Sequence, residues 1–552
     1  MAAMNLEERA EVDPRSGFCP ANSIFYSKRK LLLLPSEPFL DVTTFISGKR
    51  HSGTTAFIDS HSGRRLSFSE LWHSVDAVAS ALSVIHGVRK GQVVLILSPN
   101  SIFFPIVSLA VMSIGAVLTT TNPLNTPPEI SSQVADSRPV LAFSTRLLLP
   151  KLAGLGFPIV LLDGSLATSD EGSRVVTTID EMIANGPEVG RRREPVSQDD
   201  TATLLYSSGT TGTSKGVVST HRNLIAMIEI LNERFSGKGE KLTFLCTVPM
   251  FHVYGLAGFA IGMLGIGATV VILSGRFDFE EMVRAVAEHK VTHLPVVPPI
   301  LVSMSGSQKR LPLDSLLAVI CGGAPLSREM TEMFRDKYPA IDIMQGYGLT
   351  ETAAMGSSAE TAEESRRYGT AGLLVSNAEA RIVDPITGKF LPVNRTGELW
   401  IRGPFVMTGY FNDSKETQLT LKPDGWLKTG DLCYIDGDGY LFVVDRLKEL
   451  IKYKGYQVAP SELEARLLTH PEIIDAAVIP LPDKEAGQIP MACVVRKKGS
   501  ELSEAAIMEF IREQVAPYKR IRRVAFLPVI PKTPSGKILR RDLIRLAAAS
   551  KL

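Results

Sequence analysis

One run of small residues, 207–216, has the composition of a loop that binds phosphate. It reads SSGTTGTSKG, so three glycines and one lysine are combined with serine and threonine only. Such a backbone can approach an anion without Cβ clashes and can direct several N–H groups at it, although its glycine spacing differs from that of the P-loop. A strand-like stretch, 203–206, precedes the run, and 221–235 has the spacing of an amphipathic helix. We therefore predict a strand, a phosphate-binding loop and a helix, with a flexible linker as the alternative.

Four further positions carry charged groups that suit nucleotide chemistry. The segment 345–351, QGYGLTE, ends in Glu351, and a carboxylate oxygen is a ligand that Mg²⁺ prefers. Asp431 follows Thr-Gly, Arg446 follows an aspartate, and Lys537 lies in PSGKILR. Taken singly, these residues predict only a turn, a surface ion pair and a solvated lysine. They indicate nucleotide chemistry only if all four are found in the same chain.

The chain length and the net charge limit the number of domains and the kinds of ligand that can be expected. With 552 residues the chain is too long for one hydrophobic core, so two or more domains are expected. Its net charge of +2 gives no overall field that would attract nucleic acid. From Arg446 onward, 20 Lys and Arg face 12 Asp and Glu, so this part is basic. Because the run 519–523 has no interleaved aromatic residue beyond Tyr518, a phosphate-rich small molecule is favoured over nucleic acid.

Cysteine usage and the two ends of the chain predict a cellular compartment. The five cysteines are scattered and form no Cys-x-x-Cys pair, so we expect packing residues rather than disulfides or a zinc site. The first 18 residues lack the apolar core of a secretory signal. The tripeptide Ser550, Lys551 and Leu552 is a peroxisomal address at a chain end. We expect peroxisomal localisation, through an import receptor that binds this tripeptide.

The segment 242–275 contains no formally charged side chain. Pro249, His252 and several glycines interrupt it, so no transmembrane segment is expected. We predict instead, buried in a large α/β domain, a strand at 243–248, a helix at 256–264 and a strand at 268–273. A segment of this kind also suits the wall of an acyl pocket.

The order of strand-like and helical runs predicts the fold class. Up to residue 446 they alternate, with strand-like runs at 93–97, 140–143, 159–162 and 316–320, which is typical of parallel sheets with helices on both faces. After Gly397 the pattern becomes β-rich. A small α+β domain is expected beyond Lys448, its first helix starting at Ser461 with Glu464 in a capping box. The fold class is α/β: an N-terminal domain (1–446) of parallel and mixed sheets, flanking helices and a β-rich subdomain, then a C-terminal domain (447–552).

These motifs occur in order along nearly the whole chain, and together they resemble the signatures of the adenylate-forming superfamily, which includes acyl-CoA synthetases, firefly luciferase and the adenylation domains of peptide synthetases. GELWIRG at 397–403 is a further match. PMFHVYG at 249–255 and RLKELIKYKGYQV at 446–458 are most similar to the plant 4-coumarate:CoA ligase group. The resemblance implies an AMP-forming acid–thiol ligase that uses ATP, CoA and Mg²⁺ and has a mobile C-terminal domain.

The resemblance also implies residue roles. Thr350, His252 and Lys537 would be catalytic, together with Glu351, which would hold Mg²⁺. The residues assigned to ATP are Ser207, Ser208, Gly209, Thr210, Thr211, Gly212, Lys215, Gln345, Gly346, Tyr347, Thr350, Asp431, Arg446 and Lys537. Those assigned to the acyl-adenylate are Tyr254, Gly323, Gln345, Gly346, Thr350, Met355, Lys448, Lys452 and Gln457. Those assigned to CoA are Arg276, Lys454 and Gly455. After acyl-AMP and pyrophosphate form, the C-terminal domain would pivot about Lys448 and withdraw Lys537, and the thiol would enter past His252.

The sequence departs from 4-coumarate ligases where the acid would bind. Ile320 stands where those enzymes carry a lysine that can meet the phenolic hydroxyl, and 352–355 reads TAAM instead of Ala-Gly-Pro-Val. A buried phenol without a partner costs about 1–3 kcal/mol. We therefore expect an apolar acid, either a medium-chain fatty acid or the cyclopentanone-octanoate precursor of jasmonate, whose peroxisomal ligases this chain resembles.

Other functions remain open at this stage. A 4-coumarate or cinnamate ligase of phenylpropanoid metabolism and a luciferase-like adenylating monooxygenase share the motifs. A non-catalytic binding protein is disfavoured because Lys215, Glu351 and Lys537 are all present. A phosphotransferase would be possible if function rested on the glycine-rich loop alone.

Overall fold

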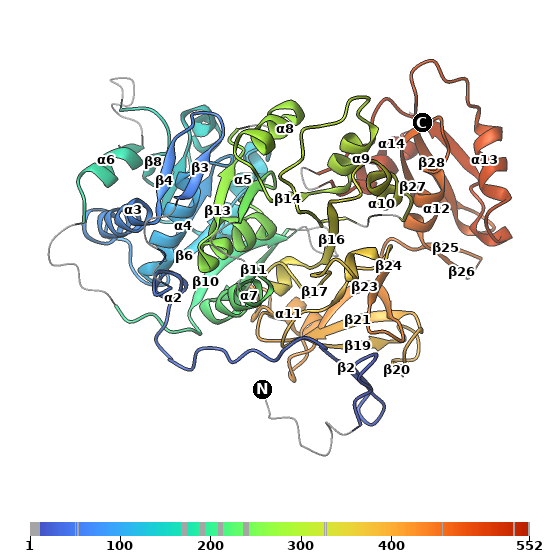
Figure 1. Ribbon diagram of the computed structural model, residues 1–552, viewed down its shortest axis with the longest axis horizontal. Coiled ribbons are helices and arrows are strands. Elements are labelled where there is room, and N and C mark those ends of the chain that lie inside the picture. The colour runs from blue at the N-terminus through green and yellow to red at the C-terminus, as the bar shows by residue number, and fades with distance from the viewer. Residues whose placement is uncertain are drawn as a thin grey trace.

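The computed structural model describes residues 11–49, 51, 55–166, 174–187, 194–207, 214–235, 242–275, 277–324, 326, 328–454, 456–533 and 536–549. Within these residues the strands form four sheets. In Figure 1 most strands of the first two sheets are blue to olive, the third sheet lies below them and is mainly yellow and orange with the dark-blue β2, and the red C-terminal sheet lies at the right. The α/β fold class, with a large N-terminal part and a separate C-terminal domain, agrees with the prediction.

The first sheet has the strand order β22-β11-β10-β6-β5-β7-β8-β9. It is parallel from β10 to β9. Its strands are β5 (Val93–Leu97), β6 (Val117–Thr120), β7 (Leu141–Ser144), β8 (Ile159–Leu161), β9 (Val175–Thr178), β10 (Thr201–Ser207), β11 (Lys215–Thr220) and β22 (Gly409–Tyr410). The strand predicted at 93–97 is confirmed, and those at 140–143 and 159–162 shift by one residue at one or both ends.

The glycine-rich run lies in a different setting from the predicted strand, loop and helix. Strand β11 pairs antiparallel with β10, with Ser207 opposite Lys215, so the run closes a hairpin. The helix α7 (His221–Arg234) begins only after β11, and Thr220 caps it by accepting a hydrogen bond from the backbone N–H of Asn223. The predicted strand at 203–206 is confirmed within β10, and the predicted helix at 221–235 is confirmed to within one residue as α7. Strand β11 between them was not predicted, because it forms by pairing with β10 and β22. The loop residues 208–213 lie outside the described residues.

The second sheet has the order β18-β17-β16-β15-β14-β12-β13-β3-β4. It is parallel from β16 to β3 and antiparallel at both edges. Its strands are β3 (Thr55–Asp59), β4 (Arg65–Ser67), β12 (Thr243–Cys246), β13 (Thr269–Ile272), β14 (His293–Val296), β15 (Ala318–Cys321), β16 (Asp342–Tyr347), β17 (Ser357–Ser358) and β18 (Leu373–Leu374). The run predicted as a strand at 316–320 begins two residues later, at β15.

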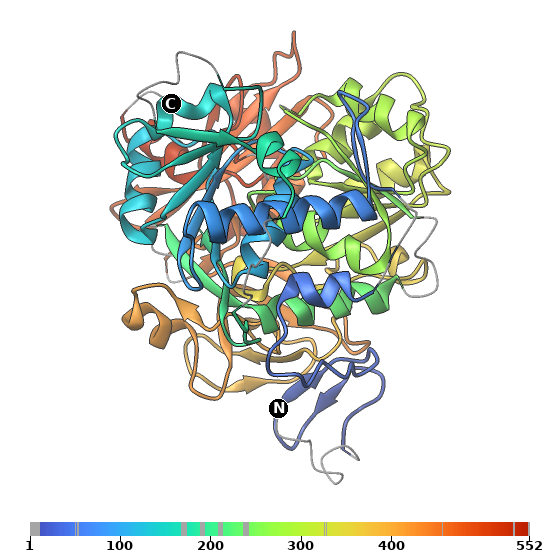
Figure 2. The same cartoon turned by 90° about the vertical axis from the view of Figure 1, so that its left-hand side faces the viewer.

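Helices fill the space between these two sheets. Helix α4 packs on β6 of the first sheet and on η5, which packs on β12 of the second, and in Figure 2 helices lie between the cyan strands and the yellow-green elements. Most of this layer belongs to one large apolar core. The helices of the N-terminal part are α2 (Val42–Ser47), α3 (Phe68–Ser80), η1 (Ala81–Ile85), α4 (Phe103–Ser113), α5 (Pro127–Ser137), η2 (Arg146–Leu152), α6 (Ile179–Ala184), α7, η5 (Tyr254–Ile261), η6 (Gly262–Ile266), α8 (Phe279–Glu288), α9 (Pro298–Gly306) and α10 (Arg328–Lys337).

The uncharged segment forms a less regular helix than predicted. The helix predicted at 256–264 is present as two consecutive segments, the π-helix η5 and the 3₁₀-helix η6. The flanking strands, β12 and β13, are shorter than predicted. Near the start of η5 the chain requires glycine, since a Cβ on Gly255 would lie 2.1 Å from the carbonyl oxygen of Pro249. The close approach fixes the turn that carries His252 and Tyr254.

The third sheet is the predicted β-rich part. It runs β1-β2-β19-β21-β23-β24, with β20 beside β19, and its strands are antiparallel. The bounds are β1 (Phe18–Cys19), β2 (Ile24–Tyr26), β19 (Glu379–Val383), β20 (Phe390–Leu391), β21 (Gly397–Arg402), β23 (Leu427–Ile435) and β24 (Leu441–Arg446). Nearby helical turns are η7 (Thr350–Thr352), η8 (Glu364–Arg366) and α11 (Ser414–Thr420).

The C-terminal domain contains the fourth sheet and its own apolar core. Its strands are β25 (Ile451–Tyr453), β26 (Tyr456–Val458), β27 (Ile473–Asp483), β28 (Gly487–Arg496) and β29 (Arg523–Phe526). Its helices are α12 (Pro460–Leu467), α13 (Glu504–Arg512), η9 (Pro517–Lys519) and α14 (Arg540–Ala548). The turn after β24 leads from the third sheet into this domain (Figure 1).

The predicted capping box of the first C-terminal helix was wrong. Helix α12 begins at Pro460, one residue before Ser461, and Ala459 at its N-cap offers no side-chain hydrogen bond. Proline is favoured at the first helical position because it has no N–H to satisfy. Ser461 donates instead to the carbonyl oxygen of Val444, and buried Glu464 pairs with Arg540 of α14 at 2.7 Å.

Two further predictions concern the whole chain. All five cysteines are buried and free, as expected of packing residues. Within the described ranges, no helix has both the length and the apolar character that a bilayer crossing requires.

Candidate active site

A cavity of about 1120 Å³ opens among the first three sheets and the C-terminal domain. Its lining comes from β10, the 249–254 turn, β15, β16, η7, β22 and β24, and from the segment around Lys537. The predicted site residues that line it are Ser207, His252, Tyr254, Gly323, Gly346, Tyr347, Thr350, Glu351, Met355, Arg446 and Lys537. Residues more than 300 positions apart thus share one cavity.

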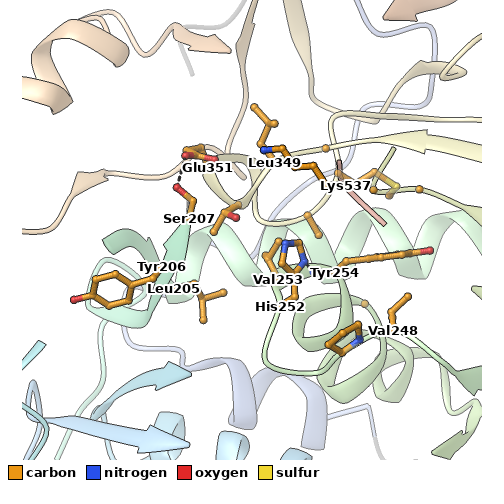
Figure 3. A pocket seen from close by; sticks show the side chains of 18 of the residues that line it. Leu205, Tyr206, Ser207, Val248, His252, Val253, Tyr254, Leu349, Glu351 and Lys537 are labelled. Atoms are coloured by element: carbon orange, nitrogen blue, oxygen red, sulfur yellow. Dashed lines mark hydrogen bonds between the residues drawn. The ribbon is translucent and has the colours of Figure 1, made fainter. Parts of the chain in front are cut away.

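Glu351 is held in place by two hydroxyl groups. Ser207 Oγ donates a hydrogen bond to Glu351 Oε1 at 3.0 Å (Figure 3), and the phenolic hydroxyl of Tyr410 donates to the same oxygen at 3.0 Å. No hydrogen bond to Oε2 is found within the described part of the chain. This carboxylate therefore has one anchored oxygen and one oxygen left for a cation in the cavity.

A second part of the site combines a buried carboxylate with a half-buried tyrosine and a half-buried guanidinium group. Asp431 and Arg446 face each other across strands β23 and β24. Asp431 Oδ1 lies 3.2 Å from Arg446 Nε, and its Oδ2 accepts a hydrogen bond from Tyr347 at 2.7 Å. Burial raises the pKa of Asp431, while Arg446 and the Tyr347 hydroxyl act in the opposite direction. A carboxylate with spare acceptor capacity beside an aromatic ring suits a nucleoside, whose sugar offers two hydroxyl donors.

Lys537 reaches the cavity from the segment before α14. Its backbone N–H donates to Thr533 Oγ1, and no ion pair of its side chain is found among the described residues. Burial lowers the pKa of Lys537 to about 8, and the charges of Arg446 and Lys448 add to the effect. Burial also lowers the pKa of His252, with a further contribution from Lys537. A neutral imidazole and a cation therefore lie close together (Figure 3).

The other end of the cavity is apolar. Tyr254 donates to the carbonyl oxygen of Ile320 at 3.3 Å, and Ile320 and Met355 also line the cavity. Beyond them the lining is contributed by α7, β12, η5 and η6, through Met227, Leu231, Phe235, Phe244, Phe259 and Met263. One cation, Arg234, lies among these residues. The cavity can thus hold a polar, phosphate-bearing molecule at one end and an apolar chain at the other.

Several predicted residues lie elsewhere. Lys215 does not itself line the cavity, but its ammonium group lies 2.5 Å from Oε1 of Glu416, which is part of the lining. Four further predicted residues do not line the cavity: Gln345, Lys448, Lys452 and Lys454. Asp431 does not line it either and is connected to it only through Tyr347 and Arg446. The following predictions fall outside the described residues: Ser208, Gly209, Thr210, Thr211, Gly212, Arg276, Gly455, the side chain of Gln457, and Ser550, Lys551 and Leu552.

Two residues of the site were missed from the sequence. Tyr410 reaches Glu351 from a two-residue strand paired with β11, and the sequence carries no signal for that pairing. Arg234 is the last residue of the amphipathic helix α7. A basic residue at the C-terminal end of a helix commonly serves only to offset the helix dipole, so nothing in the sequence distinguishes Arg234 as a site residue.

Comparison with protein families and individual proteins gives consistent matches. Residues 45–411 match the family model described as AMP-binding enzyme, and residues 462–537 match AMP-binding enzyme C-terminal domain. A protein named 4-coumarate--CoA ligase-like 4 from Oryza sativa subsp. japonica is 61% identical over 99% of this chain and 100% of its own length. Peroxisomal OPC-8:0-CoA ligase 1 from Arabidopsis thaliana is 59% identical over 98% of this chain and 99% of its own.

Solved structures show the same similarity. ATP-bound MatB from Rhodopseudomonas palustris has a TM-score of 0.82 and 25% identity, covering 92% of this chain and 99% of that one. The o-succinylbenzoate CoA synthetase from Bacillus subtilis, in complex with ATP and magnesium ion, has a TM-score of 0.77 and 27% identity, covering 90% of this chain and 98% of its own.

Proposed function

Because this chain belongs to the AMP-binding enzyme family and is an AMP-forming acyl-CoA synthetase of the plant 4-coumarate:CoA ligase-like group, we propose that its substrate is an apolar carboxylic acid rather than a phenolic one. The acid is of medium-chain length or is the cyclopentanone-octanoate precursor of jasmonate. The name of the 59% identical relative, an OPC-8:0-CoA ligase, supports the second choice.

The observation that supports this proposal is the composition of the apolar end of the cavity. Six large apolar side chains line it beyond Ile320 and Met355. At Ile320, where coumarate ligases carry lysine, the branched apolar side chain offers no partner to a phenol. Burying an unpaired hydroxyl costs about 1–3 kcal/mol, whereas each methylene of an alkyl chain gains about 0.8 kcal/mol. At the position of Ile320 the cavity therefore favours an alkyl chain over a phenol.

In the first half-reaction a carboxylate oxygen of the acid bonds to the α-phosphorus of ATP, and the bond from that phosphorus to pyrophosphate breaks. Two anions must meet, so a nearby cation stabilises the transition state. Lys537 is assigned this role, because its ammonium group reaches the cavity between His252 and Arg446. Tyr347 would stack on adenine, and Asp431 and Arg446 would hold the ribose.

The residues at Glu351 fit a magnesium ion that is shared with ATP. The described residues contain no group of three or more His, Cys, Asp or Glu that could hold a metal by themselves. Mg²⁺ commonly keeps several waters and binds one or two carboxylates together with substrate phosphates. The oxygen Oε2 of Glu351 is suited to that arrangement, and the ion would neutralise charge on the departing pyrophosphate.

In the second half-reaction the sulfur of CoA bonds to the acyl carbon, the thiol proton is lost, and AMP leaves. We assign this step to a different orientation of the C-terminal domain, reached by rotation about Lys448. The placement of Lys537 inside the cavity, with Lys452 and Lys454 outside it, is the arrangement expected for the first step. Rotation would exchange them and open a path for the thiol past His252. The domain division at residue 446 is part of this proposal.

We further propose that the enzyme acts in the peroxisome. The tripeptide of Ser550, Lys551 and Leu552 has the form of the import address, and the related OPC-8:0 ligase is named peroxisomal. A fluorescent protein fused ahead of the chain should be found in peroxisomes, and removal of these three residues should leave it in the cytosol. A peroxisomal signal from the shortened fusion would contradict the assignment.

A substrate panel tests the proposed function. Purified enzyme is supplied with magnesium, ATP, CoA and, in separate reactions, octanoate, the cyclopentanone-octanoate acid and 4-coumarate, and pyrophosphate and acyl-CoA are measured. Higher kcat/KM for the two apolar acids is expected. Preference for 4-coumarate would assign the enzyme to phenylpropanoid metabolism instead. Uptake of O₂ with light emission would indicate the luciferase-like alternative.

A further inference from the structure

Arg234 places a guanidinium group in the apolar end of the cavity. It is the last residue of α7 and lines the cavity together with Met227, Leu231 and Met355. Its partners are few: Nη2 donates to the carbonyl oxygen of Ala359 at 3.1 Å and lies 3.2 Å from Met344 Sδ. Nη1 lies 3.9 Å from Met355 Sδ. Sulfur is a weak acceptor, so most of the donors of this arginine are poorly satisfied.

One donor has no partner at all among the described residues. Arg234 Nε is buried and unpaired, and burial lowers the pKa of the side chain. An unsatisfied buried donor costs about 1–3 kcal/mol, and more when it is charged. Buried donors in native proteins are usually satisfied by protein atoms, by ordered water or by a bound ligand, and the cavity beside Arg234 has room for the last two.

The charge of Arg234 is already balanced by its surroundings. The nearby charged groups are Arg29, Glu360 and Glu364, and Arg29 pairs with Glu360 at 3.1 Å and with Glu364 at 2.8 Å. Two guanidinium groups and two carboxylates make this cluster neutral. A second carboxylate brought in by a substrate would leave an excess negative charge in a poorly solvated place, which is costly. An uncharged oxygen acceptor would satisfy the free donors without that cost.

We propose that Arg234 is a specificity-determining residue that donates a hydrogen bond to an uncharged oxygen, a ketone or a hydroxyl, on the acyl chain away from its reacting carboxyl group. The preferred acids are therefore oxygenated apolar acids rather than plain fatty acids or dicarboxylic acids. This inference rests on the proposed function, since it assigns the apolar end of the cavity to the acyl chain.

The test compares substrates of equal length on two enzymes. Wild type and Arg234→Met are assayed by pyrophosphate release with decanoate, a series of oxodecanoates with the ketone at different positions, the cyclopentanone-octanoate acid, and decanedioate. Wild type should prefer at least one keto acid over decanoate. In Arg234→Met this preference should fall about 10- to 100-fold, because a hydrogen bond to a charged donor is lost, while kcat/KM for decanoate stays equal or rises.

Matched variants separate recognition from folding. Arg234→Lys keeps a cation and should retain part of the preference. Glu233→Met changes the neighbouring position on the same helix, whose carboxylate faces Lys30 on the surface, and should leave the preference unchanged. Thermal unfolding of all variants shows whether a loss reflects the site or the fold.

The outcomes distinguish this inference from the proposed function. If wild type activates decanoate and keto acids equally, or if Arg234→Met lowers both to the same extent, Arg234 has a structural role only and the inference is wrong. A preference for decanedioate would also overturn it, because the acceptor would then be charged. If no acid of the panel releases pyrophosphate while 4-coumarate does, the proposed substrate class itself fails.

Discussion

Burial removes much of the water around the ammonium group of Lys537, and two cations, Arg446 and Lys448, lie near it together with the carboxylates of Glu449 and Asp431. With Arg446 and Lys448 nearby, the pKa of Lys537 is lowered to about 8. A lysine that must act as a cation is then close to losing its proton under ordinary conditions. Negative phosphates would raise this pKa again once ATP is bound, so the effect belongs to the free enzyme.

This gives a prediction for the pH dependence of the first half-reaction. The kcat/KM of pyrophosphate release, which reports the free enzyme, should fall as the pH rises through about 8, because the protonated form is the active one. In Lys537→Arg the activity should be lower, but the alkaline decline should move beyond pH 10, since arginine stays charged. Lys519→Arg, at a lysine paired with Glu462, should keep the decline near 8. An unshifted decline in Lys537→Arg would show that another group is responsible.

A second prediction at this scale concerns the anchoring of Glu351. Tyr410→Phe removes one of the two hydrogen bonds to Oε1, so the carboxylate should turn more freely. We expect the Mg²⁺ concentration for half-maximal pyrophosphate release to rise about five- to tenfold. Tyr434→Phe is the control, because Tyr434 stacks on Phe442 in the third sheet and does not line the cavity. An unchanged Mg²⁺ requirement in Tyr410→Phe would remove this tyrosine from the site.

At the scale of single elements, glycines decide the shape of the turn that carries His252 and Tyr254. Gly255 packs against the backbone of Pro249 so closely that a Cβ would overlap it. Gly258, one turn further along η5, has only Tyr254 Cδ2 near its Cβ position, at 3.9 Å. The two positions share one helix and differ in the space around them.

This pair predicts opposite effects on stability. Gly255→Ala should lower the free energy of unfolding by about 2–3 kcal/mol, because the turn must move to accept the methyl group. Gly258→Ala should be neutral or slightly stabilising, since alanine favours helical backbone. Urea unfolding of both variants measures the difference. Equal stability would mean that the turn yields easily and is not fixed by Gly255.

Sequence patterns predicted elements best where burial is uniform. The run 93–97 forms β5 with the predicted bounds, because a parallel strand covered on both faces is apolar throughout. Sequence patterns did not predict the bounds of an element where contacts with remote segments determine them. Lys215–Thr220 became a strand because β10 and β22 flank it, and α12 began at Pro460 rather than at the predicted Ser461.

At the scale of the whole molecule, the C-terminal domain carries two lysines whose positions relative to the cavity differ. Lys537 lines the cavity, and Lys454 is exposed and lies outside it. Lys454 has a φ of 46°, an uncommon value for a residue with a side chain. The proposed rotation predicts that the two lysines serve different half-reactions.

Single-turnover measurements separate these roles. Lys537→Ala should reduce the rate of pyrophosphate release at least 100-fold but should still convert supplied acyl-AMP to acyl-CoA at near the wild-type rate. Lys454→Ala should release pyrophosphate normally and slow the formation of acyl-CoA about tenfold or more. If both variants slow the same step, the two lysines do not exchange and the rotation is not required.

The sequence by itself determined the reaction class, and it located part of the cavity that we propose as the active site. The motifs that bind nucleotides are short and contiguous, since a loop or a strand end must present its own backbone and side chains to the ligand. Eleven of the predicted site residues line one cavity for that reason. The apolar run 242–275 was likewise expected to line a pocket, and several of its residues line the cavity.

Only the tertiary structure decided which distant groups meet. Tyr410 reaches Glu351 through the register of β22 on β11, Lys215 is engaged by Glu416, and Arg234 enters the apolar end of the cavity from the end of α7. The physical reason is that a side chain's surroundings depend on sheet register and helix packing between remote segments. The local sequence shows which chemical groups are available, whereas tertiary packing determines which other groups each of them contacts.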